Sequence, residues 1–343
     1  MAALTDAPSP PFHACLPSAA DATFPPHAAP PASFDSNRRI FSAAGAPLSV
    51  SVKLRNFFQP GEVLRDADFS VTLHPRAATP GAICYALTEA ALLRVNRNPN
   101  LSAVITTPAL AGQVSEEKGV ATVENPQESY YRLHNHLFQA GLMEPHANHF
   151  IDPSAEIAPT AVLGRKLQIG AGVKIGFGAV IHDYTILGEG TFIGDYVVLG
   201  GRGMQNTKVD GRRFKVEWAG GVKIGRDCEI LTAAIVQRPY HCEYTEIGDE
   251  TQAAGKASIG HGAKIGPRAM IGGNAQIAGN VHIGQDVWIG QASTLSDGLE
   301  IGDRAQVKMG SVVVRNVPAD AAVSGNFAIP HERNIQEFIR KNA

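Results

Sequence analysis

The sequence predicts a mainly β protein in which a parallel β-helix follows a small α/β domain. The main observation is an aliphatic residue, usually branched, at every sixth position from Ile151 to Leu199, from Ile224 to Val236 and from Ile247 to Val313. A fixed short repeat is the sequence signature of a solenoid, and a six-residue period is typical of parallel β-helices. Two further observations support this fold: the second position of most hexads is glycine, and the fifth is usually small.

Each hexad supplies one short strand and one corner. Side chains alternate along a strand, so the fifth position and the next first position point to the same side, and we expect both to stack inward. The glycine is expected to ease the corner. Three hexads make one triangular coil, and this spacing resembles the left-handed parallel β-helix of the hexapeptide-repeat proteins. A sandwich or a βαβ domain is the alternative, but neither keeps a strict six-residue repeat over so many turns.

The 343 residues exceed a typical single domain, and the sequence divides into four parts. Residues 1–40 are rich in alanine and proline without an apolar period, which predicts a disordered extension. Residues 48–148 predict the small α/β domain, with helices at Thr88 to Arg94 and Gln127 to Ala140. The prism is expected over residues 150–318, and residues 319–343 form a C-terminal segment with a short helix from Ile335 to Lys341.

Composition favours a soluble, cytoplasmic chain. The net charge of -2 gives no argument for nucleic acid or a membrane surface as a partner. No stretch approaches about 18 consecutive apolar residues, so we expect no membrane span. We expect no signal peptide, because no basic segment precedes an apolar run at the N-terminus. The four cysteines lack a metal-like CxxC pairing.

Two interruptions of the six-residue repeat predict loops that leave the prism. The step from Leu199 to Ile224 is not a multiple of six, and neither is the step from Val236 to Ile247. The second interruption spans Gln237 to Glu246. The first loop carries Arg212, Arg213, Lys215 and Trp218. Loops that leave a rigid solenoid often carry binding groups, although tolerated surface insertions are the alternative.

Five segments carry a resemblance to a known family. They are VENPQESYYRLHNHLF (Val123 to Phe138), IDPSAEIAPTAVLG (Ile151 to Gly164), SIGHGAKIG (Ser258 to Gly266), IAGNVHIG (Ile277 to Gly284) and SGNFAIPHERN (Ser324 to Asn334). Together with the order of the domains, they resemble the UDP-3-O-acylglucosamine N-acyltransferases of lipid A biosynthesis, within the hexapeptide-repeat acyltransferases. The resemblance covers roughly residues 48–335.

The resemblance implies transfer of an acyl group from a thioester to an amine by a homotrimer. The donor would be the phosphopantetheine thioester of an acyl carrier protein, or acyl-CoA, used as a co-substrate without a bound cofactor. His261 aligns with the family's catalytic base, at a third hexad position that faces outward toward a neighbouring subunit. Gly279 aligns with the residue whose N–H points at the oxyanion. The alternative for a lone histidine such as His261 is a solvated or packed side chain.

Substrate-binding residues are expected around the two loops and in the small domain. Family members clamp uracil between two aromatics, of which Tyr85 is kept and the second is replaced by Ala91. Arg238 is kept where the family has Asp-Arg-Gly. The remaining candidates are His241, in the second loop, and His282, at an outward position. No HxxxxH pair lies near His261, so we expect no metal.

The sequence also departs from the family beside the predicted base. Ala254 and Gly255 stand where the family carries Asp-Asn, so the acid expected to orient the imidazole is missing. Gly298 stands where the family carries a second histidine. The side chains considered as replacements for the acid are Glu246, His241 and Glu243.

Three hypotheses about function follow. The first is an N-acyltransferase that acts on a UDP-3-O-acylglucosamine type of acceptor. The second is the same chemistry on a different amine, for instance in a secondary-metabolite pathway. The third is a non-catalytic binding protein that retains the prism.

Overall fold

A computed structural model gives the structure of the chain. It describes residues 51–75, 79–145, 148–204, 207–209, 211–325 and 331–342. The disordered extension expected over residues 1–40 lies outside the described residues.

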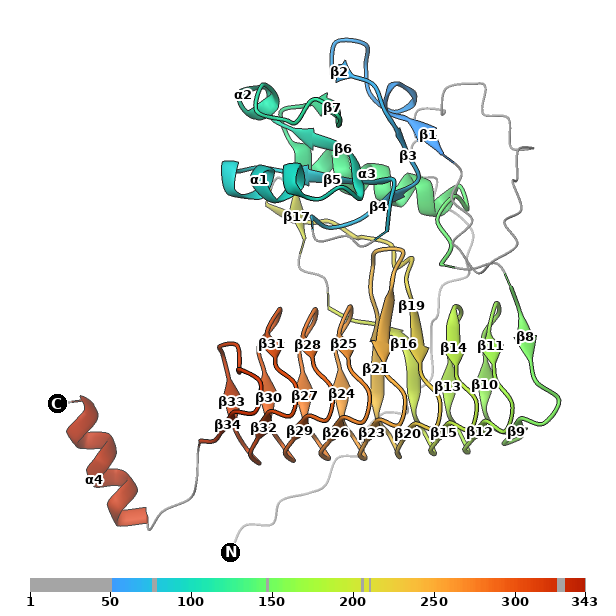
Figure 1. Cartoon of the computed structure of the whole chain (residues 1–343), viewed down its shortest axis with the longest axis vertical. Helices are drawn as coiled ribbons and strands as arrows, with labels where there is room; N and C mark the ends of the chain where they lie inside the picture. The colour runs from blue at the N-terminus through green and yellow to red at the C-terminus, as the bar shows by residue number, and fades with distance from the viewer. Residues whose placement is uncertain are drawn as a thin grey trace, which may run out of the picture. The chain divides into compact units, whose positions relative to one another are not determined.

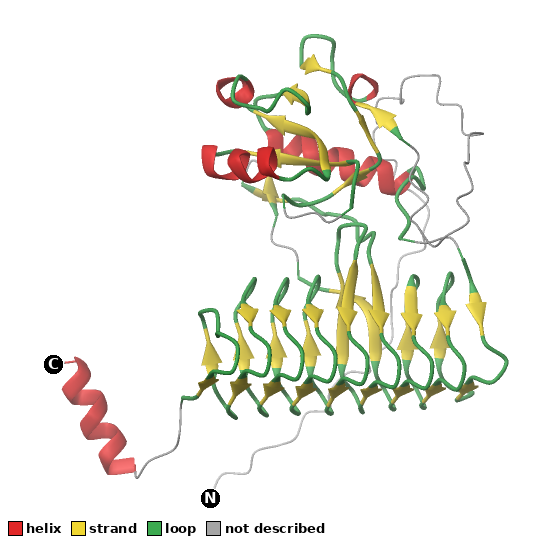
Figure 2. Cartoon of the chain, in the orientation of Figure 1, coloured by secondary structure: helices red, strands yellow, loops and turns green. Residues whose placement is uncertain are grey.

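The small domain is built on a five-stranded sheet in which four strands run parallel and one edge strand, β2, runs antiparallel. Its strands, in spatial order, are β2 (Val63–Arg65), β7 (Gly119–Thr122), β6 (Leu101–Thr106), β5 (Ala82–Ala86) and β4 (Val71–Thr72). Figure 2 shows the helices of this domain in red beside the strands in yellow. The remaining elements are the antiparallel pair β1 (Val52–Lys53) and β3 (Asp68–Phe69), the 3-10 helix η1 (Leu54–Asn56), and helices α1 (Glu89–Arg97), α2 (Pro108–Ala111) and α3 (Pro126–Gln139).

Helix α3 is one of the elements of this domain that reach the prism loops, and its start follows from local chemistry. The Asn125 side chain accepts a hydrogen bond from the Glu128 N–H at 3.1 Å, which satisfies one of the unpaired donors of the first turn. Pro126 occupies the first turn, where its missing N–H costs nothing. The predicted helix from Gln127 to Ala140 corresponds to α3.

From Phe150 to Val323 the chain forms a left-handed parallel β-helix of stacked triangular coils (Figure 1). Its strands make three parallel sheets, which we call faces one, two and three. Face one contains β10 (Val162–Leu163), β13 (Val180–Ile181), β16 (Val198–Arg202), β21 (Ile235–Arg238), β24 (Ser258–Ile259), β27 (Gln276–Ile277), β30 (Thr294–Leu295) and β33 (Val312–Val313). Face two contains β8 (Phe150–Ile151), β11 (Gln168–Ile169), β14 (Thr185–Leu187), β19 (Gly221–Ile224), β22 (Tyr244–Ile247), β25 (Lys264–Ile265), β28 (His282–Ile283) and β31 (Glu300–Ile301). Face three contains β9 (Glu156–Ile157), β12 (Lys174–Ile175), β15 (Phe192–Ile193), β20 (Glu229–Ile230), β23 (Gln252–Ala253), β26 (Met270–Ile271), β29 (Trp288–Ile289), β32 (Gln306–Val307) and β34 (Ala322–Val323).

The aliphatic first positions and the small fifth positions fill the interior of the prism, as the repeat predicts. Ile259 and Ala263 are both fully buried, and the same pattern continues from coil to coil. Burial of aliphatic side chains is the main stabilising term of such a core. Each strand pairs with the strand one coil later, so the coils support one another throughout the described prism.

The second-position glycines have a different cause from the one expected. A Cβ atom at Gly188 would lie 2.4 Å from the Gly225 carbonyl oxygen of the next coil. Glycine is therefore needed because two backbones approach closely there. The turn conformation itself falls at the fourth position, where Tyr184 and Asn280 have φ values of 63° and 56°.

Aspartates at the third hexad position hold several coils together. Their Oδ1 atoms accept hydrogen bonds from the N–H of the third-position residue one coil earlier. Examples are Arg165 to Asp183 at 2.7 Å, Phe177 to Asp195 at 2.8 Å, Arg226 to Asp249 at 2.9 Å and Gln285 to Asp303 at 3.0 Å. A carboxylate that accepts a backbone N–H makes a charge-assisted hydrogen bond, so this pattern caps the corners that carry it.

Both interruptions of the repeat leave the prism along the edge between faces one and two. The first excursion connects β16 to β19 and contains an antiparallel pair of strands, β17 (Lys208–Val209) and β18 (Arg212–Arg213). The second excursion connects β21 to β22. Figure 1 shows β16, β19 and β21 extending beyond their neighbours at this point. The C-terminal helix, α4 (His331–Asn342), begins before the predicted Ile335.

Replacement of Gly188 by alanine should destabilise the prism, because its methyl group would overlap the carbonyl of the next coil. We expect a loss of roughly 1–3 kcal/mol in the free energy of unfolding, as for other overpacked sites. Gly61→Ala is the control, because a Cβ there meets nothing within 4 Å. Urea denaturation measures both variants, and equal midpoints would contradict the close-approach explanation.

Candidate active site

His261 lies on the edge between faces one and two, in the turn that follows β24. Its ring is enclosed by aromatic side chains from the two excursions. The ring centroid of Trp218 is 5.9 Å away with an interplanar angle of 77°, and that of Tyr240 is 6.3 Å away at 62°. The sequence predicts a histidine that faces outward from the prism, and at this corner the side chain is half-buried because Trp218 and Tyr240 of the excursions lie beside it.

Gly279 and Asp297 follow His261 in the same column, each one coil further along the prism. A Cβ atom at Gly279 would lie 2.6 Å from Cε1 and 2.7 Å from Nε2 of His261, and 2.8 Å from Oδ1 of Asp297. The Nε2 edge of the imidazole and a carboxylate oxygen therefore converge over this glycine. Any side chain at position 279 would displace one of them.

The backbone N–H of Gly279 is a candidate oxyanion donor. Gly279 is buried, and its carbonyl oxygen accepts the Gly298 N–H at 2.9 Å. Among the described residues, none accepts a hydrogen bond from the N–H of Gly279. A preorganised N–H that is unpaired beside a base is what stabilisation of a tetrahedral oxyanion requires.

Burial lowers the pKa of His261, and the nearby charge of Asp297 raises it by less. The net direction is downward, so the imidazole is neutral at pH 7 and able to accept a proton. Neither ring nitrogen of His261 has a hydrogen-bond partner among the described residues, and no buried side-chain nitrogen or oxygen of those residues lacks one. Both nitrogens are therefore accessible to solvent. The ring is thus enclosed enough to stay neutral and open enough to react.

The first excursion docks on α3 of the small domain. The Asn135 side chain donates to the Lys215 carbonyl at 2.8 Å and accepts the Glu217 N–H at 2.9 Å. The Nε2–H of buried His134 donates to the Glu217 carbonyl at 3.0 Å, and its Nδ1 accepts the Thr72 hydroxyl at 2.6 Å. Burial lowers the pKa of His134 to about 4, in keeping with this neutral arrangement. These contacts fix the segment that leads into Trp218.

The second excursion is anchored in the same domain by His241. This residue was predicted to bind substrate, and it is buried, with an exposed fraction of 5%. Its Nδ1 lies 3.1 Å from the Thr72 carbonyl oxygen and 3.2 Å from the Tyr130 hydroxyl. Burial, with the neighbouring histidines, holds the pKa of His241 well below its ordinary value. The contacts of His241 therefore hold the loop that carries Tyr240.

A series of aromatic contacts connects Tyr85, the predicted nucleotide-binding residue, to His261, the predicted base. The Tyr85 ring centroid lies 6.0 Å from that of Tyr131, which lies 6.3 Å from that of Tyr240. Tyr240 in turn contacts His261. Tyr85 is partly buried, and its ring also packs against Tyr130 at 5.0 Å. Ala91, at the expected second clamp position, packs on the core of the small domain.

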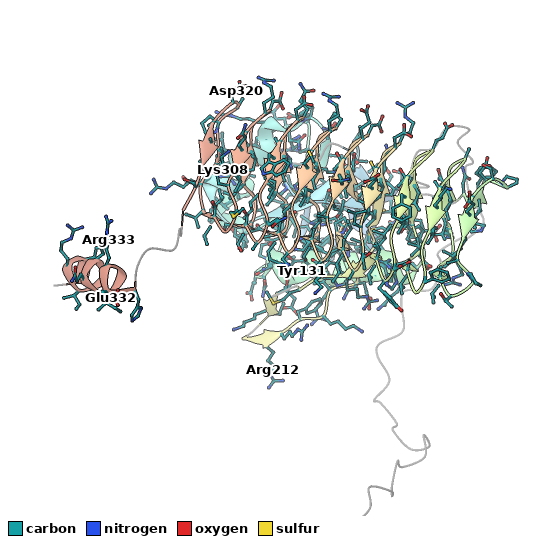
Figure 3. All side chains as sticks on the ribbon, turned by 90° about the horizontal axis from the view of Figure 1, so that it is seen from below. Tyr131, Arg212, Lys308, Asp320, Glu332 and Arg333 are labelled. Atoms are coloured by element: carbon teal, nitrogen blue, oxygen red, sulfur yellow. The ribbon has the colours of Figure 1, made fainter. Side chains whose placement is uncertain are left out.

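The basic residues predicted around the excursions separate into two groups. Arg238 is partly buried, its Nε donates to the Gly200 carbonyl, and burial lowers its pKa. This hydrogen bond stabilises the β-bulge between Leu199 and Gly201 in β16, so the guanidinium is already engaged within the protein. Arg212 and Arg213 are exposed on β18, and Figure 3 shows Arg212 pointing away from the rest of the chain.

The other candidates lie away from the column. His282 is exposed on β28, between Lys264 and Glu300 of the adjacent coils. Glu246, considered as an acid for His261, lies at ion-pair distance from Lys264. Glu243, considered for the same role, lies 3.4 Å from His74. The described residues contain no group of three or more histidines, cysteines, aspartates or glutamates that could hold a metal.

Two residues beside His261 were not identified as site residues from the sequence. Trp218 was assigned only to a loop, and Asp297 was not singled out. The signal for Asp297 is its spacing: His261, Gly279 and Asp297 occupy the same hexad position in three successive coils. For Trp218 no equivalent signal exists, because the first excursion has no repeat from which a neighbour can be counted.

The chain is similar to several acyltransferases. It is 33% identical over 262 residues to the UDP-3-O-acylglucosamine N-acyltransferase of Leptothrix cholodnii, which covers 66% of this chain and 74% of that protein. Among solved structures, LpxA from Acinetobacter baumannii is 26% identical, with a TM-score of 0.35, over 57% of this chain and 76% of that one. The UDP-N-acetylglucosamine acyltransferase of Campylobacter jejuni is 22% identical, with a TM-score of 0.39, over 52% and 72%. No family model matches the chain.

The prism, the column of His261, Gly279 and Asp297, and the similarity to the Leptothrix enzyme define a hexapeptide-repeat acyltransferase. Within that class, the chain belongs to the UDP-3-O-acylglucosamine N-acyltransferase family. The resemblance found in the sequence is thereby confirmed. No helix in the described ranges is long and apolar enough to cross a bilayer.

Removing Trp218 should raise the pKa of His261, because water would then reach the ring and the cost of charging it would fall. An NMR titration of the imidazole in Trp218→Ala measures this change. Trp288→Ala is the control, since Trp288 is 46% exposed on face three. An unchanged His261 pKa in Trp218→Ala would refute the burial explanation.

Proposed function

We propose that the protein is an N-acyltransferase that moves an acyl group from a thioester to the amine of a nucleotide sugar of the UDP-3-O-acylglucosamine type. The thioester would be carried by an acyl carrier protein or by CoA as a co-substrate, with no bound cofactor. Such donors belong to the cytoplasm, where we place the reaction. The observation that carries the proposal is the half-buried imidazole of His261, whose pKa burial lowers, beside Gly279, whose N–H has no hydrogen-bond acceptor among the described residues.

The proposed reaction proceeds by direct attack. Gly279 N–H donates to the thioester carbonyl oxygen while the acceptor nitrogen attacks the carbonyl carbon and His261 takes a proton from that nitrogen. The tetrahedral intermediate then collapses. Its carbon–sulfur bond breaks, the amide remains, and the thiolate receives the proton from the imidazolium. Holding both reactants at one edge supplies a further part of the rate, because it replaces a bimolecular encounter.

A different amine as acceptor is the second candidate, and the packing around Tyr85 favours it. The Tyr85 ring packs against Tyr130 and Tyr131, whereas Ala91 offers no aromatic surface for a second stacking partner. Loss of one stacking ring removes roughly 0.5–1.5 kcal/mol beyond area burial. Incubation with an acyl thioester and either UDP-3-O-acylglucosamine or a panel of simple amines, followed by mass spectrometry, separates the two candidates. Turnover of simple amines alone would favour the second.

A homotrimer is part of the proposal, and the composition of face one supports it. The outward sixth-position residues of face one carry no charge: Val162, Val180, Val198, Ile235, Ser258, Gln276, Thr294 and Val312. Faces two and three carry charges at this position, for example Lys264 and Glu229. A face whose outward sixth positions carry no charge is the one suited to pack against another subunit. His261 lies on an edge of face one, so a neighbouring subunit would complete its surroundings.

Replacing His261 by alanine should lower kcat/KM for acyl transfer by roughly 10²- to 10⁴-fold, the usual contribution of a general base. In the unsubstituted enzyme, activity should fall on acidification below about pH 6.5, because protonated His261 cannot accept a proton and its pKa is lowered. His331→Ala, at the exposed start of α4, is the control. Undiminished transfer by His261→Ala would contradict the assigned role.

Placing a charge on face one should disrupt the trimer. Ile235→Arg is expected to give a mass close to the monomer in size-exclusion chromatography with light scattering, since an unpaired charge is costly to bury in an interface. The matched control is Met270→Arg, because Met270 is 43% exposed and Ile235 is 40% exposed, but Met270 lies on face three. The proposed interface would be wrong if only the Met270 variant dissociated.

A further inference from the structure

Asp297 is the carboxylate nearest to the Nε2 edge of His261 in the described site. It follows β30 on the edge between faces one and two, one coil beyond Gly279 and two beyond His261. Its Oδ1 and the imidazole Nε2 lie 2.8 and 2.7 Å from one common point, the missing Cβ of Gly279. The glycine thus leaves room for the acid and the ring to face one another.

Asp297 also departs from the pattern that other third-position aspartates follow. Asp183, on the same edge, accepts the N–H of the third-position residue one coil earlier at 2.7 Å, and Asp303 does so at 3.0 Å. For Asp297 the equivalent donor would be the Gly279 N–H, but the structure contains no hydrogen bond between the two. The Oδ1 atom of Asp297 instead lies beside the space above Gly279 that Nε2 of His261 also borders, and the Gly279 N–H stays available as an oxyanion donor.

No side chain in the described part of the structure neutralises the charge of Asp297. Among the described residues it has no ion-pair partner, and its hydrogen-bond contact is Asn280 Nδ2, at a long 3.5 Å. The side chain is exposed, so an incoming molecule can reach it. The acids considered from the sequence are engaged elsewhere, Glu246 with Lys264 and Glu243 with His74.

We propose that Asp297 binds the ammonium group of the acceptor and delivers it to His261. This inference rests on the proposed N-acyl transfer. Oδ1 of Asp297 and Nε2 of His261 both lie beside the space above Gly279. The bound ammonium first releases one proton to solvent, because a nitrogen without a lone pair cannot attack. The free amine then donates one hydrogen bond to Oδ1, attacks the thioester carbon and gives its next proton to Nε2, which passes that proton to the thiolate. Asp297 then also stabilises the imidazolium that forms. It is a specificity residue for amines, because a neutral hydroxyl gains less from a carboxylate than an ammonium does.

The electrostatic part of this proposal can be measured without any substrate. The titratable groups around the His261 imidazole are Tyr240 and His241 from the second excursion and Asp297 from the prism. Of these, Asp297 raises the pKa of His261. Asp297→Asn removes the charge and keeps the shape, so the NMR-measured pKa of His261 should fall. Asp303→Asn, which removes a corner-capping aspartate, should leave it unchanged.

The binding part is tested by steady-state kinetics on the full-length protein with an acyl thioester and the amine acceptor that it uses. We expect Asp297→Asn to lower kcat/KM for the amine by about 10- to 100-fold, mainly through the KM of the amine, with the KM of the thioester unchanged. These values correspond to loss of a charge-assisted hydrogen bond. Asp297→Glu should recover part of the loss. Circular dichroism melting checks that each variant folds.

The outcomes separate this inference from the proposed function. An unchanged His261 pKa in Asp297→Asn overturns it, and so does an unchanged kcat/KM for the amine. A wild-type protein that transfers no acyl group to any amine defeats the proposed function. In that case the His261 pKa alone decides whether Asp297 acts on the ring.

Discussion

Backbone pairing between successive coils is the constraint on which the rest of the structure depends. It stacks residues one coil apart, as Ser258 stacks on Gln276 and Gln276 on Thr294. Strands that pair in this way lie only about 4.8 Å apart, which leaves little room at the corners. That spacing excludes a Cβ atom at Gly188, and it brings the imidazole of His261 against the backbone of Gly279. The same ladder therefore explains both a structural requirement and the geometry of the candidate active site.

The prism by itself does not produce the environment of His261. A side chain at a third hexad position would stand at an exposed corner, with an ordinary pKa. The two excursions change this, because Trp218 and Tyr240 enclose the ring and are held in turn by contacts with α3. The small domain thus influences the column through the loops that it fixes. Aromatic contacts also run from Tyr240 through Tyr131 of the small domain to Tyr85.

Two opposing effects act on the His261 imidazole, and burial is the larger. Desolvation disfavours the charged ring, while the carboxylate of Asp297 favours it. Asp297 has the weaker influence because it is exposed and water screens its charge. A substrate or a neighbouring subunit that displaced this water would strengthen the attraction. The balance suits a base that is neutral before the reaction and stabilised once it has gained a proton.

The six-residue repeat by itself determined the prism, the inward stacking of its side chains and the third-position placement of His261. A short, constant period on a rigid backbone places residues 18 apart next to one another, so the stacked neighbours can be counted from the sequence. The same counting puts Gly279 and Asp297 above His261, although the importance of Asp297 was missed. The tertiary structure decided the rest. The burial of His261 by Trp218 and Tyr240, the anchoring role of His241 and the engagement of Glu246 and Glu243 all depend on loops without a repeat. Their positions follow from packing between segments far apart in the sequence, and no local pattern encodes such packing.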